Sequence, residues 1–325
     1  MIRIPPEALH SWSTEVLAAL GVPDNDATHI ARCLIDVDLR GVRSHGTRQL
    51  RRYVKEFRNG LVNTTPVIRV LRETDHSLRL DGDGGAGYLV ASRATDSTCD
   101  KTNAVGLAVA ATCNHGHVGS AGIYARRVLS HGFIGWCVAG GAAWNRTDDP
   151  DATVWDAMRA PPMCFAVPSD DGGPPLVLDM NANQFGSAAQ AEAAIAAGFG
   201  KSVFGSLGMR FVSTLLGGLL AGAAPDPAPD HVYASATRGF FLLVIDPALV
   251  GDAEAFRTDV RRIIDASLTL KPMAGADVSA LPGTLEWRRE AEWTTAGIPI
   301  TDDHRDLLET IAMELALDLP PWIEA

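Results

Sequence analysis

The fold class is decided by one segment of the chain, Gly106-Leu107-Ala108-Val109-Ala110-Ala111-Thr112-Cys113-Asn114-His115-Gly116-His117-Val118-Gly119-Ser120-Ala121-Gly122. Its apolar run (Gly106–Ala111) predicts a strand, and the amphipathic pattern that follows it (Ser120–Ser130) predicts a helix. The loop between them is rich in glycine, so its backbone can approach a ligand, and amides at the helix start suit a phosphate. A strand, a glycine-rich loop and a helix in this order indicate an α/β fold.

The alternation of strands and helices extends on both sides of this segment. Further strand-like runs are Val67–Leu71, Ser77–Leu80, Phe133–Val138, Met163–Val167, Leu176–Met180 and Phe240–Ile245. Helical patterns lie near Tyr88–Asn103, Ala188–Ala197, Met209–Leu220 and Asp252–Leu270. Irregular backbone is expected mainly in the acidic, Pro/Gly-rich stretch Asp148–Pro175. An α/β architecture is therefore predicted for the middle of the chain.

The two ends of the chain are predicted to be helical. Apolar residues at helical spacing predict three helices before residue 66, the first ended by Gly21-Val22-Pro23 and the third by Gly60. Near the C-terminus, helical patterns cover Thr284–Ala296 and Asp302–Leu317.

Composition narrows the class of protein. The chain has 325 residues, 46% of them hydrophobic, and a net charge of −11 from 39 acidic and 28 basic residues. Such a surface repels polyanions, so we expect neither nucleic acid nor an anionic membrane as a partner. The longest apolar stretches, Phe133–Trp144 and Phe211–Ala224, are interrupted by glycines and are shorter than the roughly 20 residues that span a bilayer.

The cysteines and the start of the sequence indicate a reducing compartment. The five cysteines are odd in number and lack CxxC spacing, which argues against a disulfide framework and a zinc site. The first residues, Met1-Ile2-Arg3-Ile4-Pro5-Pro6, do not resemble a signal peptide. We therefore expect a cytoplasmic protein.

One glycine motif is misleading. Gly82-Asp83-Gly84-Gly85-Ala86-Gly87 matches GxGxxG between a predicted strand and a predicted helix. A Rossmann unit also needs an acidic residue at the end of its second strand to hold the ribose, but that strand ends Ala111-Thr112-Cys113-Asn114. A structural glycine turn is the preferred interpretation.

Two histidine segments are candidate sites. His45, in Ser44-His45-Gly46, joins two predicted helices and has several arginines near it, so it can pass a proton while an arginine holds a carboxylate. The alternative is a capping serine beside a solvated basic helix. His115 and His117 could bind a metal, but no acidic or cysteine partner lies at useful spacing, so we expect no metal site.

Several blocks in order, over nearly the whole chain, form one signature. They are Asp38-Leu39-Arg40-Gly41-Val42-x-Ser44-His45-Gly46 with Arg52-Tyr53-Val54 and Gly60-Leu61-Val62-Asn63, Asp81-Gly82-Asp83-Gly84-Gly85-x-Gly87, Asn114-x-x-His117-x-Gly119-x-x-Gly122-x-Tyr124-Ala125, Leu178-Asp179-Met180, and Leu281-Pro282-Gly283-x-x-Glu286-Trp287-Arg288-Arg289-x-Ala291-Glu292 with Gly297-Ile298-Pro299-Ile300. With these blocks the chain resembles the L-lactate/malate dehydrogenase-like family of NAD(P)-dependent oxidoreductases, which includes ureidoglycolate and sulfolactate dehydrogenases and piperideine-2-carboxylate reductase.

The resemblance implies a non-Rossmann α/β fold whose N- and C-terminal helices pack together. Residues 1–65 and 275–325 would form a helical substrate and dimer domain, and residues 66–274 a cofactor-binding domain shortened in its central part. It also implies NAD or NADP as cofactor, a small acidic substrate and a homodimer. The apolar stretch Phe211–Ala224 is suitable for the dimer interface.

The resemblance further implies roles for single residues. His45, or in some relatives the residue matching His117, transfers the proton, and Ser44 orients it. The expected cofactor contacts are Gly119, Ser120, Asp179, Met180, Asn181, Pro282 and Gly283.

The sequence departs from the family in three places. The substrate arginine expected four residues after His45 is Gln49, so either Arg48 takes its place or the substrate is not a simple 2-oxo acid. The Gly-Thr-Asn-Pro block reads Arg159-Ala160-Pro161-Pro162. The Lys-Gly-Tyr-Gly block reads Gly205-Ser206-Leu207-Gly208, unless Lys201 replaces it. Cofactor binding is therefore expected to be weakened or lost.

Three functions stay open at this point. The first is an NAD(P)-dependent oxidoreductase acting on a 2-oxo, 2-hydroxy or cyclic imino acid, in which Arg48 and Gln49 meet the substrate. The second is the same scaffold without nicotinamide, as a lyase, isomerase or cyclase in which His45 and His117 do acid–base chemistry. The third is a non-catalytic partner subunit.

Overall fold

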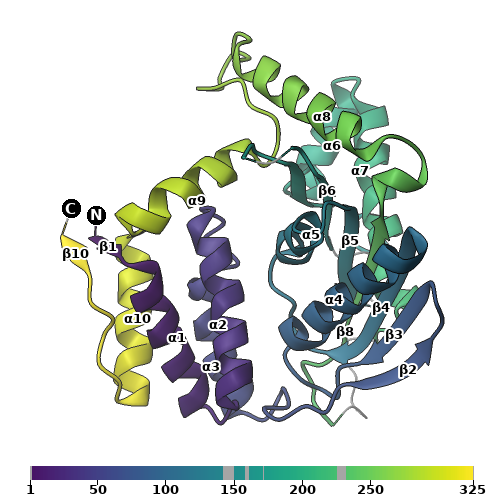
Figure 1. Cartoon of the computed structure of the whole chain (residues 1–325). Helices are drawn as coiled ribbons and strands as arrows, with labels where there is room; N and C mark the ends of the chain where they lie inside the picture. The colour runs from purple at the N-terminus through teal and green to yellow at the C-terminus, as the bar shows by residue number, and fades with distance from the viewer. Residues whose placement is uncertain (1, 142–149, 158–160, 171, 225–231, 325) are drawn as a thin grey trace.

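The computed structural model describes residues 2–141, 150–157, 161–170, 172–224 and 232–324. Within this part of the chain, one layer consists of helices from both ends of the sequence, and the other is an α/β layer from the middle (Figure 1). The predicted packing of N- and C-terminal helices is therefore confirmed.

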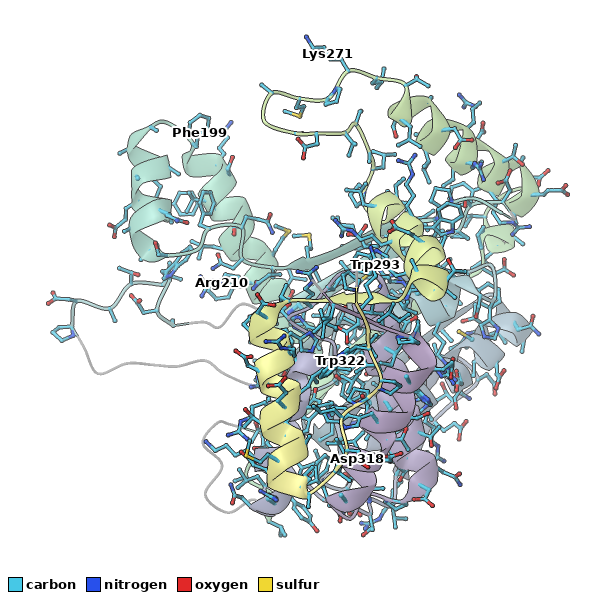
Figure 2. The ribbon with its side chains drawn as sticks, turned by 90° about the vertical axis from the view of Figure 1, so that its left-hand side faces the viewer. Phe199, Arg210, Lys271, Trp293, Asp318 and Trp322 are labelled. Atoms are coloured by element: carbon cyan, nitrogen blue, oxygen red, sulfur yellow. The ribbon has the colours of Figure 1, made fainter. Side chains whose placement is uncertain are left out.

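The helical layer contains α1 (Pro6–Ala19), α2 (Asp24–Leu39), α3 (Leu50–Arg58), α9 (Thr284–Ala296) and α10 (Asp302–Leu315). A small antiparallel sheet in the order β10-β1-β9 joins its ends, with β1 (Ile2–Ile4) between β9 (Ile298–Ile300) and β10 (Ile323–Glu324). The segment before β10 passes Asp318 and Trp322 along the helices (Figure 2), and the Trp12 indole donates to the Asp318 carbonyl at 2.8 Å. The sequence analysis missed these three strands, because they are short and pair only with distant segments.

The α/β layer contains a seven-stranded sheet in the order β2-β3-β4-β8-β5-β6-β7. Its strands are β2 (Arg69–Glu73), β3 (Ser77–Asp81), β4 (Leu107–His115), β5 (Ile134–Gly141), β6 (Pro162–Val167), β7 (Leu176–Asn181) and β8 (Arg238–Ile245). Each corresponds to a predicted strand. One of them, β6, lies inside the stretch predicted to be irregular.

The sheet topology excludes a Rossmann fold, as predicted. Within the sheet only β3 and β4 pair in parallel, whereas β4, β8, β5, β6 and β7 pair antiparallel in turn. The Gly82–Gly87 motif is a packed turn between β3 and α4 (Gly87–Val105). A Cβ atom at Gly85 would lie 2.4 Å from Pro66, and one at Gly87 would lie 2.6 Å from the Gly116 carbonyl oxygen. These glycines are therefore needed for packing.

Helices cover both faces of the sheet. On one face, α5 (Ala121–Leu129) contacts β5, where a Cβ atom at Gly135 would touch Val128. On the other face, a Cβ atom at Gly140 would touch the backbone of Gly217 in the π-helix η2 (Thr214–Leu220). The two glycines are an odd number of positions apart, so they point to opposite faces.

The helical pattern predicted near Met209–Leu220 is longer than expected. It begins with α7 (Gly200–Ser213) and continues through η2, giving 21 helical residues, so Gly217 and Gly218 do not end the helix and the expected short length is wrong. Length and apolar composition alone would let this helix cross a membrane, but 44% of its apolar window is buried inside the protein. It packs on β5 and β8.

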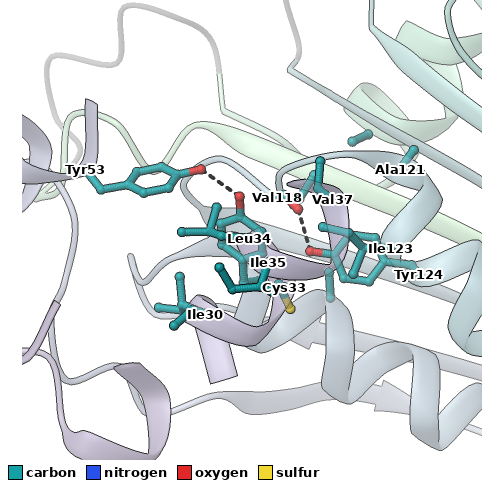
Figure 3. Packing of buried hydrophobic residues seen from close by; sticks show 14 of the residues in the cluster. Ile30, Cys33, Leu34, Ile35, Val37, Tyr53, Val118, Ala121, Ile123 and Tyr124 are labelled. Atoms are coloured by element: carbon teal, nitrogen blue, oxygen red, sulfur yellow. Dashed lines mark hydrogen bonds between the residues drawn. The ribbon is translucent and has the colours of Figure 1, made fainter. Parts of the chain in front are cut away.

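The helix before α7 is α6 (Ala188–Ala196), and α8 (Ala253–Leu268) follows the sheet. Phe199 lies at the tip of the α6–α7 hairpin, far from the helical layer (Figure 2). The main core runs through both layers and includes Leu34, Tyr88 and Tyr124. Figure 3 shows part of it, where the Tyr124 hydroxyl donates to the Val118 carbonyl at 2.6 Å. All five cysteines are buried and unpaired.

Candidate active site

A cavity of about 480 Å³ lies between the helical layer and the sheet. This volume is within the roughly 300–1,000 Å³ range of small-molecule and cofactor sites. Its lining includes every residue predicted for catalysis or cofactor contact: Ser44, His45, His117, Gly119, Ser120, Asp179, Met180, Asn181, Pro282 and Gly283. These residues come from segments far apart in the sequence, and the fold brings them to one place.

The loop that carries His45 is held in place by the buried carboxylate of Asp38. Asp38, near the end of α2, accepts hydrogen bonds at Oδ2 from the Thr47 backbone amide (2.9 Å) and the Thr47 hydroxyl (2.6 Å). A Cβ atom at Gly46 would lie 1.8 Å from Asp38 Oδ1, so only glycine fits there without displacing the carboxylate. The Thr47 hydroxyl also lies 3.0 Å from His304 Nε2 of α10. Hydrogen bonds thus connect the His45 loop to α2 and to α10.

His45 and His117 form a stacked pair, with ring centroids 5.8 Å apart and planes inclined by 29°. Both histidines line the same cavity. His45 Nδ1 lies 2.9 Å from the Ser44 hydroxyl. His117 Nδ1 lies 2.8 Å from the hydroxyl of Tyr53 on α3. Each ring thus has one nitrogen bonded to a hydroxyl.

The surroundings keep both imidazoles neutral near pH 7. Burial lowers the pKa of His45, and the charge of Asp179 partly opposes this shift. The pKa of His117 lies well below its usual value because of burial, with further contributions from the charges of Arg52 and His45. A proton that enters the pair is therefore more stable on His45 than on His117.

Among the described residues, three arginines line the same cavity: Arg52, Arg126 and Arg238. Arg52 donates from Nε to Glu56 at 2.8 Å, which orients the guanidinium group and leaves its terminal nitrogens for a ligand. Sequence reasoning noted Arg52 but gave it no role, and it missed Arg126 and Arg238. A signal for Arg126 was its position one helical turn after Gly122 in the block at the start of α5.

Arg48 and Gln49, predicted to meet the substrate, lie outside this cavity. They line a second cavity of about 690 Å³ between α3 and α10. Arg48 Nη1 lies 2.6 Å from Asp303 Oδ2, and Gln49 Nε2 donates to the Ser44 carbonyl at 2.6 Å. The geometry therefore does not support their predicted role, because their polar groups are held elsewhere.

The start of α5 differs from its prediction as a phosphate site. Asp179 of β7 accepts a hydrogen bond from the Gly122 amide at 3.0 Å and another from the Ser120 hydroxyl. This carboxylate satisfies the helix start and repels a phosphate placed there. The arginines of the cavity are therefore the groups that could hold the phosphates of a dinucleotide.

The remaining lining fits a nicotinamide cofactor. Val118, Ala139 and Met180 provide apolar surface for a flat ring, and Arg126 and Arg238 provide charge for anionic groups. Arg126 forms no ion pair with any other described residue. The part of the Gly-Thr-Asn-Pro position occupied by Arg159 and Ala160 lies outside the described residues, whereas Pro161 and Pro162 line the cavity. Within the described part of the chain, no three metal-ligating side chains are grouped together.

Fold and site together define an α/β protein with a cavity that can hold an anionic ligand beside an acid–base pair. The sequence matches the malate/L-lactate dehydrogenase family over residues 4–203 and 186–309. The chain therefore belongs to this family.

Individual relatives agree with this assignment. The chain is similar to malate dehydrogenase of Pyrococcus horikoshii, with 36% identity over 179 residues, which cover 55% of this chain and 48% of that protein. It is also similar to L-sulfolactate dehydrogenase of Methanocaldococcus jannaschii, with 25% identity over 99% of each chain. Among solved structures, malate dehydrogenase of Pyrococcus horikoshii OT3 superposes with a TM-score of 0.83 and 26% identity over 98% of this chain and 97% of that one. The match to the Pyrococcus sequences thus spans about half of their length.

Proposed function

We propose that this protein is an NAD(P)-dependent dehydrogenase that interconverts a small 2-hydroxy acid and the corresponding 2-oxo acid, or reduces a cyclic imino acid. The observation that carries the proposal is the stacked His45–His117 pair facing a cavity lined by arginines. Family membership and relatives named as malate and sulfolactate dehydrogenases support the same reaction class.

Each of these side chains has a separate role in the proposed reaction. Arg52 holds the substrate carboxylate beside the histidines, since its charge acts directly on His117. During oxidation, His45 accepts the hydroxyl proton, with Ser44 orienting its ring, and during reduction it returns a proton to the oxygen. A bound nicotinamide supplies the hydride acceptor or donor. Gly119, Met180 and Asn181 shape the wall against which it would lie.

One observation favours a second candidate. Asp179 occupies the helix start at which a phosphate was expected, so a hydride-free reaction is the alternative. In a lyase, isomerase or cyclase, His45 would move a proton without any nicotinamide. The non-catalytic subunit is the third candidate, and it would need neither histidine.

Titration of the purified protein with NADH and NADPH, followed by nicotinamide fluorescence, tests the proposal. We expect saturable binding of at least one cofactor, weaker than in relatives that keep the full motifs, and turnover with a 2-hydroxy or 2-oxo acid. The absence of binding by either cofactor at millimolar concentration would favour the hydride-free reaction.

We also propose that the protein works as a cytoplasmic homodimer. Exposed apolar side chains along α7 and η2 support an interface there: Phe204, Val212, Leu215, Leu219 and Leu220. Light scattering at micromolar concentration should give twice the chain mass of 34.5 kDa, and a monomer mass would reject the dimer.

A further inference from the structure

Three side chains from three segments form a hydrogen-bonded row behind the catalytic pair. Tyr88 of α4 lies with its hydroxyl 2.8 Å from the hydroxyl of Tyr53 on α3, and the Tyr53 hydroxyl lies 2.8 Å from His117 Nδ1. A dashed line in Figure 3 marks the hydrogen bond that the Tyr53 hydroxyl forms inside the core. The two phenol rings meet edge to face, and both are buried. Burial raises the pKa of both phenols, so each keeps its proton.

The number of hydroxyl hydrogens determines which group donates in each hydrogen bond of this row. Each phenol donates one hydrogen, and the Tyr88 hydroxyl has no hydrogen-bond partner other than Tyr53 among the described residues. If Tyr53 donated to Tyr88, the buried hydrogen of Tyr88 would have no acceptor, which proteins avoid. If Tyr88 donates to Tyr53 and Tyr53 donates to His117 Nδ1, every hydrogen has an acceptor.

We propose that Tyr53, oriented by Tyr88, is a positioning residue that keeps His117 neutral with its proton on Nε2. His117 then donates a hydrogen bond to the reacting oxygen of the substrate, and His45 alone transfers the proton. This inference rests on the proposed function, and it assigns different roles to two histidines that the sequence could not distinguish.

The groups around His117 support this division. Arg52 from α3, Arg238 from β8, His45 from the loop after α2 and His115 from β4 all disfavour a second proton on its ring. His45, in contrast, has the carboxylate of Asp179 nearby, which favours a charged ring. His117 Nδ1 accepts the Tyr53 hydrogen, so Nε2 is the nitrogen left for the cavity.

The position of Tyr88 is set by a glycine of the cavity wall. Gly119 has a φ of +74°, and a Cβ atom there would lie 2.5 Å from the Tyr88 ring. The Tyr88 ring therefore packs directly against the backbone of the loop that carries His117. This contact fixes the position of Tyr88, and through Tyr53 that of the hydrogen bond to His117.

The nitrogen resonances of ¹⁵N-histidine-labelled protein test the proposal without substrate or cofactor. In the ligand-free wild-type protein at pH 7, we expect His117 to show a protonated Nε2 and an unprotonated, hydrogen-bonded Nδ1. Assignment of the His117 signals uses the spectrum of His117→Gln. A proton on Nδ1, or a doubly protonated ring, would overturn the proposal. This readout does not depend on turnover, so it separates failure of the tyrosine row from failure of the proposed dehydrogenase activity.

Variants extend the test to the reaction. Tyr53→Phe should remove the hydrogen-bond shift at Nδ1 and lower kcat roughly 10- to 100-fold with a smaller change in KM, because orientation of a hydrogen-bond donor is lost. Tyr88→Phe should give the same changes at reduced size. The matched control is Tyr124→Phe, which removes another buried tyrosine hydroxyl that bonds only the Val118 carbonyl. It should reduce thermal stability and leave the His117 resonances unchanged. A Tyr53→Phe effect no larger than that of Tyr124→Phe on both the resonances and kcat would reject the role of Tyr53.

Discussion

The floor of the cavity and its rim are built differently. The floor, defined as residues 38–53 and 114–122, is held by buried polar contacts such as Asp38–Thr47 and Tyr53–His117. The rim, defined as residues 161–220, includes the α6–α7 hairpin and exposes large apolar side chains such as Phe199 and Phe204. The match to the family is also split into two segments that meet in the rim, within residues 186–203.

The difference shows where the family's chemistry is retained. The floor holds both histidines with buried hydrogen bonds, whereas the rim lacks two sequence blocks that are usual in the family. Substitutions of floor residues that contact the histidines should therefore change turnover and ligand binding strongly, and substitutions on the exposed part of the α6–α7 hairpin should change them little.

The largest effect is expected at His45. His45→Ala should lower kcat about 10²- to 10⁴-fold without loss of the fold, because it removes the proton-transfer group and little core packing. His117→Ala should lower kcat less than His45→Ala but at least as much as Tyr53→Phe, and it should also weaken ligand binding, because the hydrogen bond to the reacting oxygen is lost. Steady-state kinetics and thermal melting of both variants check this. Activity of both variants within a few-fold of the parent would show that the floor does not carry the chemistry.

The next effect concerns Arg52 of α3 and Arg48, which lies just before that helix. Arg52→Gln should raise KM for an acidic substrate roughly 10- to 100-fold, since a charge-assisted hydrogen bond is worth about 1.5–3 kcal/mol. Arg48→Gln is the matched control, because Arg48 pairs with Asp303 outside the cavity, and it should change KM less than about threefold. If Arg48→Gln had the larger effect, the sequence-based assignment would be restored.

A third effect is pH-dependent stability. The pKa of His115 and that of His304 are each lowered to about 4 by burial, so the unfolded chain binds more protons between pH 4 and 6.5. Stability should therefore fall as the pH drops through this window, by roughly 3 kcal/mol for His115 alone at about 1.4 kcal/mol per unit. Burial raises the pKa of Asp38 to about 6, which acts in the opposite direction between about pH 4 and 6.

Thermal melting between pH 7 and pH 4 measures the net effect of the buried histidines and of Asp38 on stability. Burial also lowers the pKa of His117 and of His45, so the histidines together should outweigh Asp38 and the midpoint should fall on acidification. His304→Gln should make the fall shallower, because one of the buried neutral imidazoles is removed. A midpoint that rises toward pH 4 would mean that Asp38 outweighs the histidines.

The smallest effect compares two glycines. Gly46→Ala, in the floor, should destabilise the protein by about 1–3 kcal/mol and impair activity, because the new methyl group overlaps the bound Asp38 carboxylate. Gly205→Ala, in the rim, meets open space inside α7 and should stabilise the protein by about 0.5–1 kcal/mol. Urea unfolding of the two variants compares them. Equal destabilisation by both would contradict the distinction between floor and rim.

Local patterns in the sequence were enough to predict the positions of the seven strands of the large sheet and of most helices, and to single out the two histidine segments. Hydrophobic periodicity and glycine turns are local signals, and they remain readable within a dozen residues. The predicted strand Gly106–Ala111 is followed by no carboxylate, and this was enough to reject a Rossmann unit. The antiparallel pairing of β4 with β8 confirms that rejection.

Which polar side chains lie together could be seen only in the folded protein. Arg48 and Arg52 lie one turn apart on adjoining helical segments, yet one reaches Asp303 and the other the cavity, because their directions depend on what packs against each side of α3. Asp179 reaches the start of α5 from 57 positions away, and Tyr53 reaches His117 from 64 positions away. Such contacts depend on how elements distant in the sequence pack against one another, and no local pattern in the chain encodes their relative position.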